Sequence, residues 1–220
     1  MLPKFNNPLL LETALTHRSA LNERVSSALE SNERLEFLGD AVLELITTEF
    51  LFAEFPDEPE GILTAYRSSL VKTTTLSEVA LEIGLGEKLH MSKGEEATGG
   101  RNNPGLLADT TEAIIGAIYL DQGYEATQEF LEENLFNKFA KIKEQKLYQD
   151  SKSVLQEIVQ SKGFEAPIYK VTKEEGPDHD KQFTIEVLVN SKPAGTGMGK
   201  SKQLAQQAAA QAALKELANT

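Results

Sequence analysis

One stretch of the chain, residues 32–46, has the apolar spacing of a buried helix and yet carries a stripe of acidic side chains. At 100° per residue its acids fall within an arc of about 80°, while leucine, alanine, valine and isoleucine cover the opposite side. The acids are Glu33, Glu36, Asp40 and Glu44. Carboxylates three or four residues apart on a helix repel one another, and burial increases the repulsion. The stripe therefore either faces water or surrounds a cation.

A second acidic pair lies in a similarly apolar segment, residues 105–120. Asp109 and Glu112 are three residues apart, so they lie on one side of a helix whose other positions are almost wholly apolar. Two such helices could face each other and share cations. Carboxylates with no cysteine and little histidine nearby favour Mg²⁺, Mn²⁺ or Ca²⁺ over zinc. The alternative is an ordinary solvated face on each helix.

The two acidic segments also carry a resemblance to a known family. Residues 32–43, NERLEFLGDAVL, resemble the signature of the bacterial ribonuclease III family, and residues 106–121, LLADTTEAIIGAIYLD, resemble its second acidic segment. The second match departs at Thr111, where the family usually has an aromatic residue. Residues 60–71, EGILTAYRSSLV, resemble a third segment of the same family.

This resemblance implies a metal-dependent endoribonuclease that cleaves double-stranded RNA, as in the processing of rRNA and mRNA precursors. It implies 5′-phosphate and 3′-hydroxyl product ends, and Mg²⁺ as the cofactor with Mn²⁺ as a substitute. The expected metal ligands are Glu36, Asp40, Asp109 and Glu112, of which Asp40 and Glu112 are expected to be catalytic. Glu33 and Glu60 are expected as supporting acids. The alternative is a catalytically silent RNA-binding or assembly protein, but such relatives lose acids and all the matching acids are present here.

The resemblance further implies a homodimer in which each subunit cuts one strand. Phe37 lies at about 40° on the helix wheel, beside the acidic stripe rather than opposite it, so the core of its own subunit is not its obvious place. In the family the matching aromatic residue packs into the partner subunit. Phe37 is therefore expected at a dimer interface, and an ordinary core position is the alternative.

Composition limits the compartment and the partners. The 220 residues contain no run of 18 apolar residues and no signal-peptide layout, so we expect no membrane segment. The absence of cysteine excludes disulfides and thiolate zinc sites and fits a cytoplasmic location. A net charge of −12 argues by itself against nucleic acid. However, residues 151–220 contain nine lysines and eight acids, so the acidity belongs to residues 1–150.

Apolar residues at three- and four-residue spacing predict an all-helical endonuclease domain over residues 1–147. The expected helices cover residues 8–21, 32–52, 60–83, 105–121 and 125–147, with Asn32 as an N-cap and a loop over 86–105. The short THRS that ends at Ser19 also fits the family pattern, but a lone histidine is more often structural. His17 is therefore given no chemical role.

The character of the sequence changes at a short link, residues 148–152. Residues 153–220 then have the order α-β-β-β-α, which resembles a double-stranded RNA-binding domain. The expected elements are a helix over 151–160, strands over 168–174, 182–189 and 193–198, and a helix over 200–217. The predicted fold class is thus multidomain, with an all-α part followed by a small α+β part.

The start of the last helix is the expected RNA contact. Glycines precede Lys200 and Lys202, so free N–H groups, the helix dipole and two cations are offered to phosphates. The residues expected to contact duplex RNA are Gln156, Glu157, His179, Lys200, Ser201 and Lys202. Gln203 replaces one family lysine, and we expect modest, salt-sensitive binding by shape. The alternative is a small α+β domain whose lysines are merely solvated.

Overall fold

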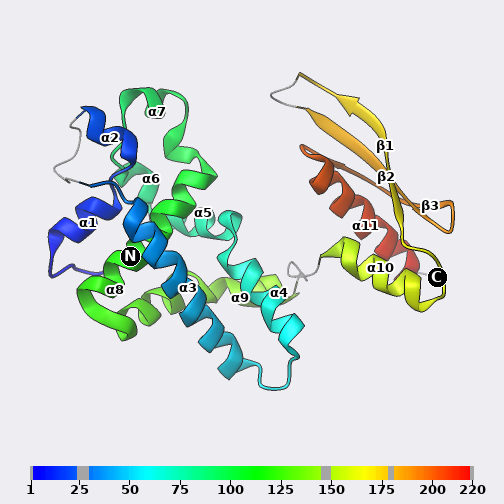
Figure 1. Cartoon of the computed structure of the whole chain (residues 1–220), viewed down its shortest axis with the longest axis horizontal. Coiled ribbons are helices and arrows are strands. Elements are labelled where there is room, and N and C mark those ends of the chain that lie inside the picture. Colours follow the sequence, from blue (N-terminus) through cyan, green and yellow to red (C-terminus); the bar gives the residue numbers. More distant parts are fainter. Residues whose placement is uncertain (1, 24–29, 145–149, 178–180, 219–220) are drawn as a thin grey trace. The chain divides into compact units, whose positions relative to one another are not determined.

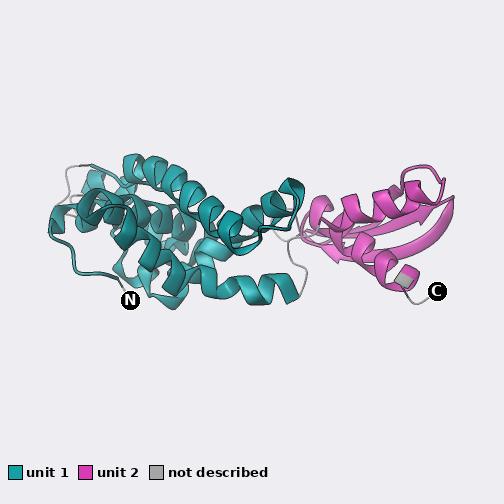
Figure 2. Ribbon diagram, turned by 90° about the horizontal axis from the view of Figure 1, so that it is seen from below, with its two compact units in different colours: residues 1–148 teal, residues 149–220 magenta. Residues whose placement is uncertain are grey.

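The computed structural model describes residues 2–23, 30–144, 150–177 and 181–218. The chain divides into two compact units, residues 1–148 and residues 149–220, which Figure 2 distinguishes by colour. The first unit is helical, and the second combines helices with a three-stranded antiparallel sheet. This confirms the predicted fold class. Within the described ranges, no helix has both the length and the apolarity needed to cross a bilayer.

Two long helices, α3 and α8, form the centre of the first unit (Figure 1). α3 spans Glu33–Glu54 and α8 spans Pro104–Asn134. Their apolar faces, with Leu43 on one and Ile114 on the other, are fully buried in the core. The shorter elements around them are α1 (Pro8–Ala14), α2 (Arg18–Glu23), α4 (Glu60–Val71), α5 (Thr73–Glu82), α6 (Leu85–Lys88), α7 (Lys93–Ala97), α9 (Phe139–Glu144) and the 3-10 turns η1 (Gly100–Asn102) and η2 (Phe136–Lys138).

The backbones of α3 and α8 approach each other at a pair of glycines. A Cβ atom on Gly39 would lie 1.8 Å from the carbonyl oxygen of Glu112, and one on Gly116 would lie 2.3 Å from that of Leu35. Any side chain at either position would push the helices apart, because the obstacle in each case is rigid backbone. The contact brings the acidic stripe of α3 beside the acidic pair of α8.

Residues 8–21 form two helices rather than the single helix that the pattern predicts. Between them, Thr16 pairs with His90 in an isolated parallel bridge. The backbone N–H of His17 donates to the carbonyl oxygen of His90 at 2.9 Å, and that of Asn32 donates to the carbonyl oxygen of Thr16 at 2.9 Å. These tertiary hydrogen bonds replace a turn of helix, so the segment runs extended between two other parts of the chain.

Two expectations about helix ends are also wrong. Residues 60–83 do not form one helix, because Lys72 adopts an extended conformation (φ −64°, ψ 150°) and separates α4 from α5. Asn32 directly precedes α3, but its side chain makes no capping hydrogen bond and its backbone is already helical. The first turn of α3 therefore leaves the Asn32 amide available for another partner.

The segment over residues 86–105 is not the plain loop that its glycines suggest. It contains α7 and η1, and Arg101 Nη1 donates to the carbonyl oxygens of Gly86 at 2.8 Å and Leu89 at 3.1 Å. Farther on, α8 kinks at Gly123 (φ 85°, ψ −169°) and continues to its end. Residues 125–147 are consequently not one helix, since η2 and α9 follow α8.

The second unit packs two helices on one sheet. Its elements are α10 (Ser151–Ser161), β1 (Ile168–Glu175), β2 (Gln182–Val189), β3 (Lys192–Gly199) and α11 (Lys202–Ala218), and the strand order is β1-β2-β3. Asn190 and Ser191 both have positive φ and form the tight turn between β2 and β3. The small residues of α11 allow a close approach to β3, where a Cβ on Gly197 would lie 2.1 Å from the backbone nitrogen of Ala209.

The start of the second unit is fixed by a helix cap. The Asp150 carboxylate accepts hydrogen bonds from the backbone N–H groups of Lys152 at 2.9 Å and Ser153 at 3.2 Å. Gln207 of α11 also donates to this carboxylate at 2.9 Å. Because of this cap, Ser151 and Lys152 form the first turn of α10, where the helix predicted over residues 151–160 begins.

Candidate functional site

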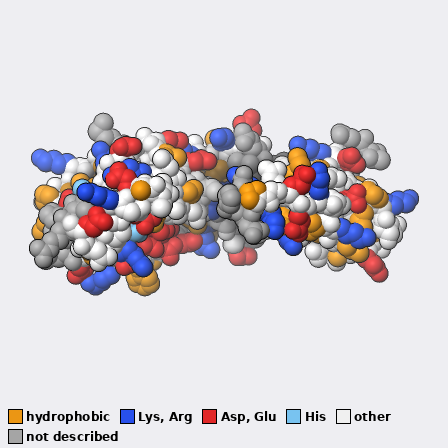
Figure 3. Space-filling model, turned by 90° about the horizontal axis from the view of Figure 1, so that it is seen from above, with side chains coloured by type: hydrophobic (Ala, Val, Ile, Leu, Met, Phe, Trp, Pro, Cys, Tyr) orange, Lys and Arg blue, Asp and Glu red, His pale blue; other side chains and the backbone are white. Residues whose placement is uncertain are grey.

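Three carboxylates converge where α3 meets α8. One oxygen each of Glu36, Asp109 and Glu112 lies within 4.8 Å of the other two. The glycine contact between the helices explains this, since it holds the two backbones close enough for short side chains to meet. Figure 3 shows acidic side chains gathered on one face of the first unit. The described part of the chain thus brings together three of the four ligands that the sequence predicts.

The pKa values of all three carboxyl groups in this cluster are raised. Burial, together with the nearby charges of Asp40, Asp109 and Glu36, raises the pKa of Glu112 to about 7. Burial is also the main cause of the raised pKa of Glu36, to which Asp109 and two other acids add. The pKa of Asp109 is raised by burial too, while His17 acts in the opposite direction. Three half-buried acids that repel one another offer a cation a net gain on binding.

Asp40, the fourth predicted ligand, lies at the edge of the cluster. Its side chain is exposed, and it is not among the three acids whose oxygens lie within 4.8 Å of one another. It is close enough to be the largest charge effect on the pKa of Glu112 and a smaller one on Glu36. Asp40 therefore borders the site without sharing its tightest contacts.

Thr111, which departs from the family pattern, keeps the packing beside the acids. Its side chain is buried, and its hydroxyl donates to the carbonyl oxygens of Leu107 at 2.9 Å and Leu76 at 3.2 Å. The second bond ties α8 to α5. Thr111 thus fills this buried position with a hydroxyl whose hydrogen bonds are satisfied.

The two predicted supporting acids lie in different places. Glu33 lines a cavity of about 590 Å³ together with Glu36 and Asp109, and Arg18 approaches it to 3.5 Å. Glu60 instead lines a groove between α3 and α4, and neither Glu36 nor Asp109 lines that groove. The Glu60 carboxylate accepts a hydrogen bond from the Thr64 hydroxyl at 3.1 Å. Of these two supporting acids, Glu33 adjoins the acidic cluster of its own subunit and Glu60 does not.

The other residues that line this 590 Å³ cavity include two polar ones to which the sequence assigns no chemical role. They are His17, which is half-buried, and Asn32, which has 4% of its surface exposed. The THRS motif was the available signal for His17. For Asn32 the sequence contains no such signal, because an asparagine directly before a helix usually serves as its N-cap. The structure shows that the Asn32 side chain does not cap α3.

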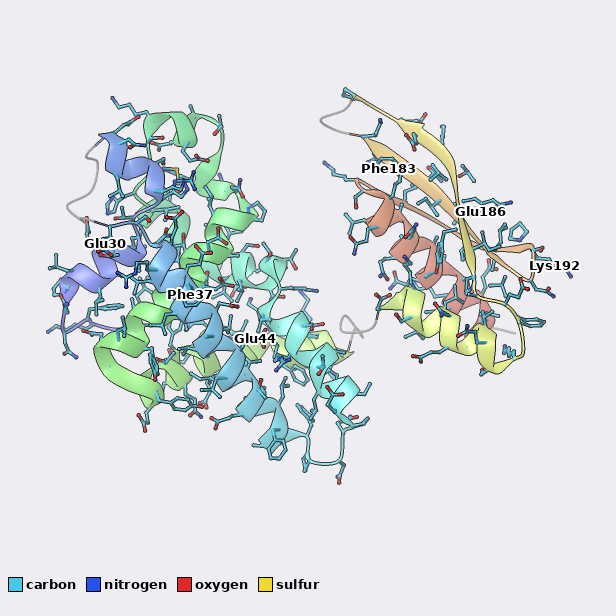
Figure 4. All side chains as sticks on the ribbon, in the orientation of Figure 1. Glu30, Phe37, Glu44, Phe183, Glu186 and Lys192 are labelled. Atoms are coloured by element: carbon cyan, nitrogen blue, oxygen red, sulfur yellow. The ribbon has the colours of Figure 1, made fainter. Side chains whose placement is uncertain are left out.

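Phe37 projects from α3 with 83% of its surface exposed, and Figure 4 labels its side chain. It borders a groove of about 710 Å³ whose apolar lining includes Leu10, Leu38 and Leu120. A phenylalanine that is exposed beside an apolar groove has an unfavourable contact with water. The side chain is clearly not part of the core of its own subunit.

In the second unit, the predicted RNA contacts lie on exposed surfaces. Gln156 and Glu157 are exposed on α10, and Lys200 and Lys202 are exposed at the start of α11. Ser201 caps α11, since its hydroxyl accepts a hydrogen bond from the backbone N–H of Leu204 at 3.2 Å. His179 lies outside the described residues.

An acidic neighbour partly neutralises this basic helix start. Glu174 on β1 lies 3.3 Å from Lys202 Nζ and 3.9 Å from Lys181 Nζ. Lys202 also lies over the ring of Phe183, 5.5 Å from its centre. A phosphate that approaches Lys202 must therefore compete with a carboxylate already paired with it.

Two known protein families match the chain, one in each of its two units. Residues 7–139 match a family described as ribonuclease-III-like, and residues 151–217 match the double-stranded RNA binding motif. The chain is 46% identical over 214 residues to ribonuclease 3 of Enterococcus faecalis, covering 97% of this chain and 92% of that protein. It is 45% identical over 212 residues to ribonuclease 3 of Bdellovibrio bacteriovorus, covering 96% and 90%.

Solved structures of a nuclease domain are similar as well. A crystal structure of the nuclease domain of Campylobacter jejuni ribonuclease III is 40% identical, with a TM-score of 0.56 over 62% of this chain and 88% of that chain. A second structure of that domain, described for flexibility in a region involved in dimer formation, is 41% identical. Its TM-score is 0.54, over 60% of this chain and 90% of the other.

Proposed function

The chain belongs to the ribonuclease III family, and we propose that it cleaves double-stranded RNA with a divalent metal ion held by Glu36, Asp109 and Glu112. It is an endoribonuclease of the ribonuclease III type. The observation that carries the metal site is the convergence of these three carboxylates from two helices. Asp40 completes the site from its edge, and Asp40 and Glu112 are the acids we assign to catalysis.

The donor set fits Mg²⁺. All the ligands are hard carboxylate oxygens, which suit Mg²⁺ and Mn²⁺ and not zinc. The raised pKa values of Glu36, Asp109 and Glu112 point the same way, because a cation among these groups removes the repulsion that raises them. A bound divalent ion supplies positive charge that offsets the negative charge growing on the phosphoryl oxygens.

The protein's own groups then have separate tasks. Glu33, which adjoins the cluster, is proposed as a supporting acid, while the supporting role of Glu60 stays a prediction. In the second unit, Gln156, Glu157, His179, Lys200, Ser201 and Lys202 are proposed to hold the duplex. Their exposure, along α10 and at the start of α11, supports this for those that the structure describes. The reaction leaves 5′-phosphate and 3′-hydroxyl ends on RNA precursors in the cytoplasm.

A homodimer is proposed as the active form, with Phe37 at its interface. The supporting observations are the 83% exposure of Phe37 and the apolar groove beside it. A Phe37 side chain from one subunit that entered the groove of the other would bury about 100 Å² or more of apolar surface at each of two symmetric contacts.

The experiment that tests the function is the incubation of long duplex RNA with the protein, with and without Mg²⁺. The expected result is cleavage only with the metal, and products that accept a 3′-ligated adaptor and carry a 5′-phosphate. Binding of the duplex without any cleavage, at every Mg²⁺ or Mn²⁺ concentration, would instead establish the silent RNA-binding protein.

A further inference from the structure

The cavity beside the acidic cluster is not lined by acids alone. Glu36 and Asp109 form one side of this space of about 590 Å³, and His17 and Asn32 lie in its lining as well. Neither has a part in the metal site proposed above. The cavity is therefore a place where a ligand could touch the metal-binding acids and the side chains of His17 and Asn32 at once.

Asn32 is a buried residue whose side-chain amide faces the cavity and makes no hydrogen bond to the residues that the structure describes. Only 4% of Asn32 is exposed, and its side chain makes no capping bond to α3. Among the residues that the structure describes, hydrogen bonds to Asn32 involve its backbone only, through Thr16 and Glu36. An amide that lines an open cavity and has no protein partner can bond a ligand or water that enters the cavity.

His17 is oriented by a chain of hydrogen bonds. The backbone N–H of Ser92 donates to Ser19 Oγ at 3.0 Å, so the Ser19 hydroxyl proton is directed to His17 Nδ1 at 2.8 Å. The backbone N–H of Ser19 also donates to Nδ1, at 3.3 Å. With Nδ1 accepting, the neutral ring carries its proton on Nε2, on the opposite edge. His17 thus presents a donor to the cavity.

The two side chains are held in place by the backbone as well. The extended segment that interrupts the predicted helix is bonded on one side to His90, through His17, and on the other side to Asn32, through Thr16. Asn32 is therefore bonded to Thr16, the residue directly before His17. The backbone positions of the two residues are thus fixed, and Asn32 Nδ2 and His17 Nε2 can both donate to a ligand oxygen.

We propose that Asn32 and His17 form a subsite that hydrogen-bonds a backbone oxygen of the RNA strand next to the scissile phosphate. This inference rests on the proposed function, since it takes the acids to be the cleavage site. Two RNA groups have the required acceptor oxygen, namely a ribose 2′-hydroxyl and a non-bridging phosphate oxygen. Both occur at every nucleotide, so the subsite would position the strand without reading its sequence.

The test uses a short RNA duplex with one cleavage site and single modifications near it. Each of the three nucleotides on either side of the cut receives, in turn, a 2′-deoxyribose or an uncharged methylphosphonate. With the wild-type protein, one position should slow single-turnover cleavage by about tenfold, the rate equivalent of one hydrogen bond. The sugar and the phosphate arms identify which oxygen is bound.

The variants Asn32→Ala and His17→Ala should cleave the unmodified duplex about tenfold more slowly, mainly through kcat, because the second unit supplies most of the binding. On these variants the modification at the sensitive position should cost less than about twofold, since the bond is already lost. His90→Gln is the matched control, because His90 lies on the same extended pairing but its ring contacts Glu12, 3.5 Å away, and lies outside the cavity.

Two results would overturn the subsite. One is a wild-type protein that cleaves the unmodified duplex and shows no sensitive position for either modification, which requires no variant to fold. The other is a sensitive position whose penalty is as large in folded Asn32→Ala and Asn32→Ser as in the wild type and in His90→Gln. A wild-type protein that fails to cleave the unmodified duplex in Mg²⁺ would instead refute the proposed function.

Discussion

Replacing Glu112 with glutamine tests both the electrostatics of the acidic cluster and its function. Burial, and to a smaller extent the charges of Asp40, Asp109 and Glu36, raise the pKa of Glu112 from 4.5 to about 7. The folded chain therefore holds this proton more tightly than the unfolded chain does. By linkage, the free energy of unfolding falls as pH rises from about 4.5 to about 7, and it stays lower above that range.

The magnitude follows from the size of the shift. A change from 4.5 to about 7 corresponds to about 3 kcal/mol at most. Because the side chain is only half-buried, water screens the charge and we expect about 1–2 kcal/mol. Glutamine does not ionise, so Glu112→Gln should raise the melting temperature of the metal-free protein by about 3–6 °C at pH 8. At pH 4.5 the two proteins should melt at nearly the same temperature.

The same substitution should remove most of the activity. Loss of one carboxylate weakens metal binding, and we expect cleavage at limiting Mg²⁺ to slow by about 100- to 1000-fold, with partial rescue by Mn²⁺. Added Mg²⁺ should stabilise the wild type more than the variant. Glu129→Gln, an exposed position on the same helix, is the control and should change neither property. An equal gain in melting temperature at pH 4.5 and pH 8, or an unchanged cleavage rate, would refute the reasoning.

Three further predictions concern the dimer and RNA binding. Phe37→Ala should shift sedimentation toward the monomer while Phe52→Ala, an exposed phenylalanine at the other end of α3, should not; a dimeric Phe37→Ala that merely melts earlier would contradict the interface. Glu174→Gln should raise affinity for duplex RNA in gel shifts by about two- to fivefold by releasing Lys202, and an equal rise in Glu175→Gln, whose partner is Lys173, would count against it. A folded fragment of residues 1–147 should still cleave at low salt and lose activity steeply as salt rises, so a fragment inactive at every salt concentration would be incompatible with a nuclease confined to the first unit.

Periodicity was sufficient to predict the elements that bury a regular face. The three strands lie within one or two residues of their predicted positions, and α3 begins one residue after Asn32. Both depend on local patterns, namely apolar spacing bounded by turn residues. The acidic pairs were visible for the same reason, because an acid in an otherwise apolar face stands out against the pattern.

Tertiary hydrogen bonds decided what the pattern could not predict. Residues 8–21 have the composition of a helix, and the break depends on His90, some seventy residues away, and on Asn32. No local signal marks that pairing. It is also what places His17 and Asn32 beside the acids, so the missed helix break and the missed residues have one physical cause.

The spacing of the carboxylates has a similar origin. Gly39 lies in the middle of α3, where glycine weakens a helix by about 1 kcal/mol relative to alanine. That cost is offset because Gly39 and Gly116 allow the backbones of α3 and α8 to pack in direct contact. The same contact brings carboxylate oxygens of Glu36, Asp109 and Glu112 within 4.8 Å of one another. The close packing and the charge repulsion are thus inseparable in the metal-free protein. A cation relieves the repulsion without loosening the packing, which is why the pH dependence of stability and the metal dependence of cleavage should both change when Glu112 is replaced.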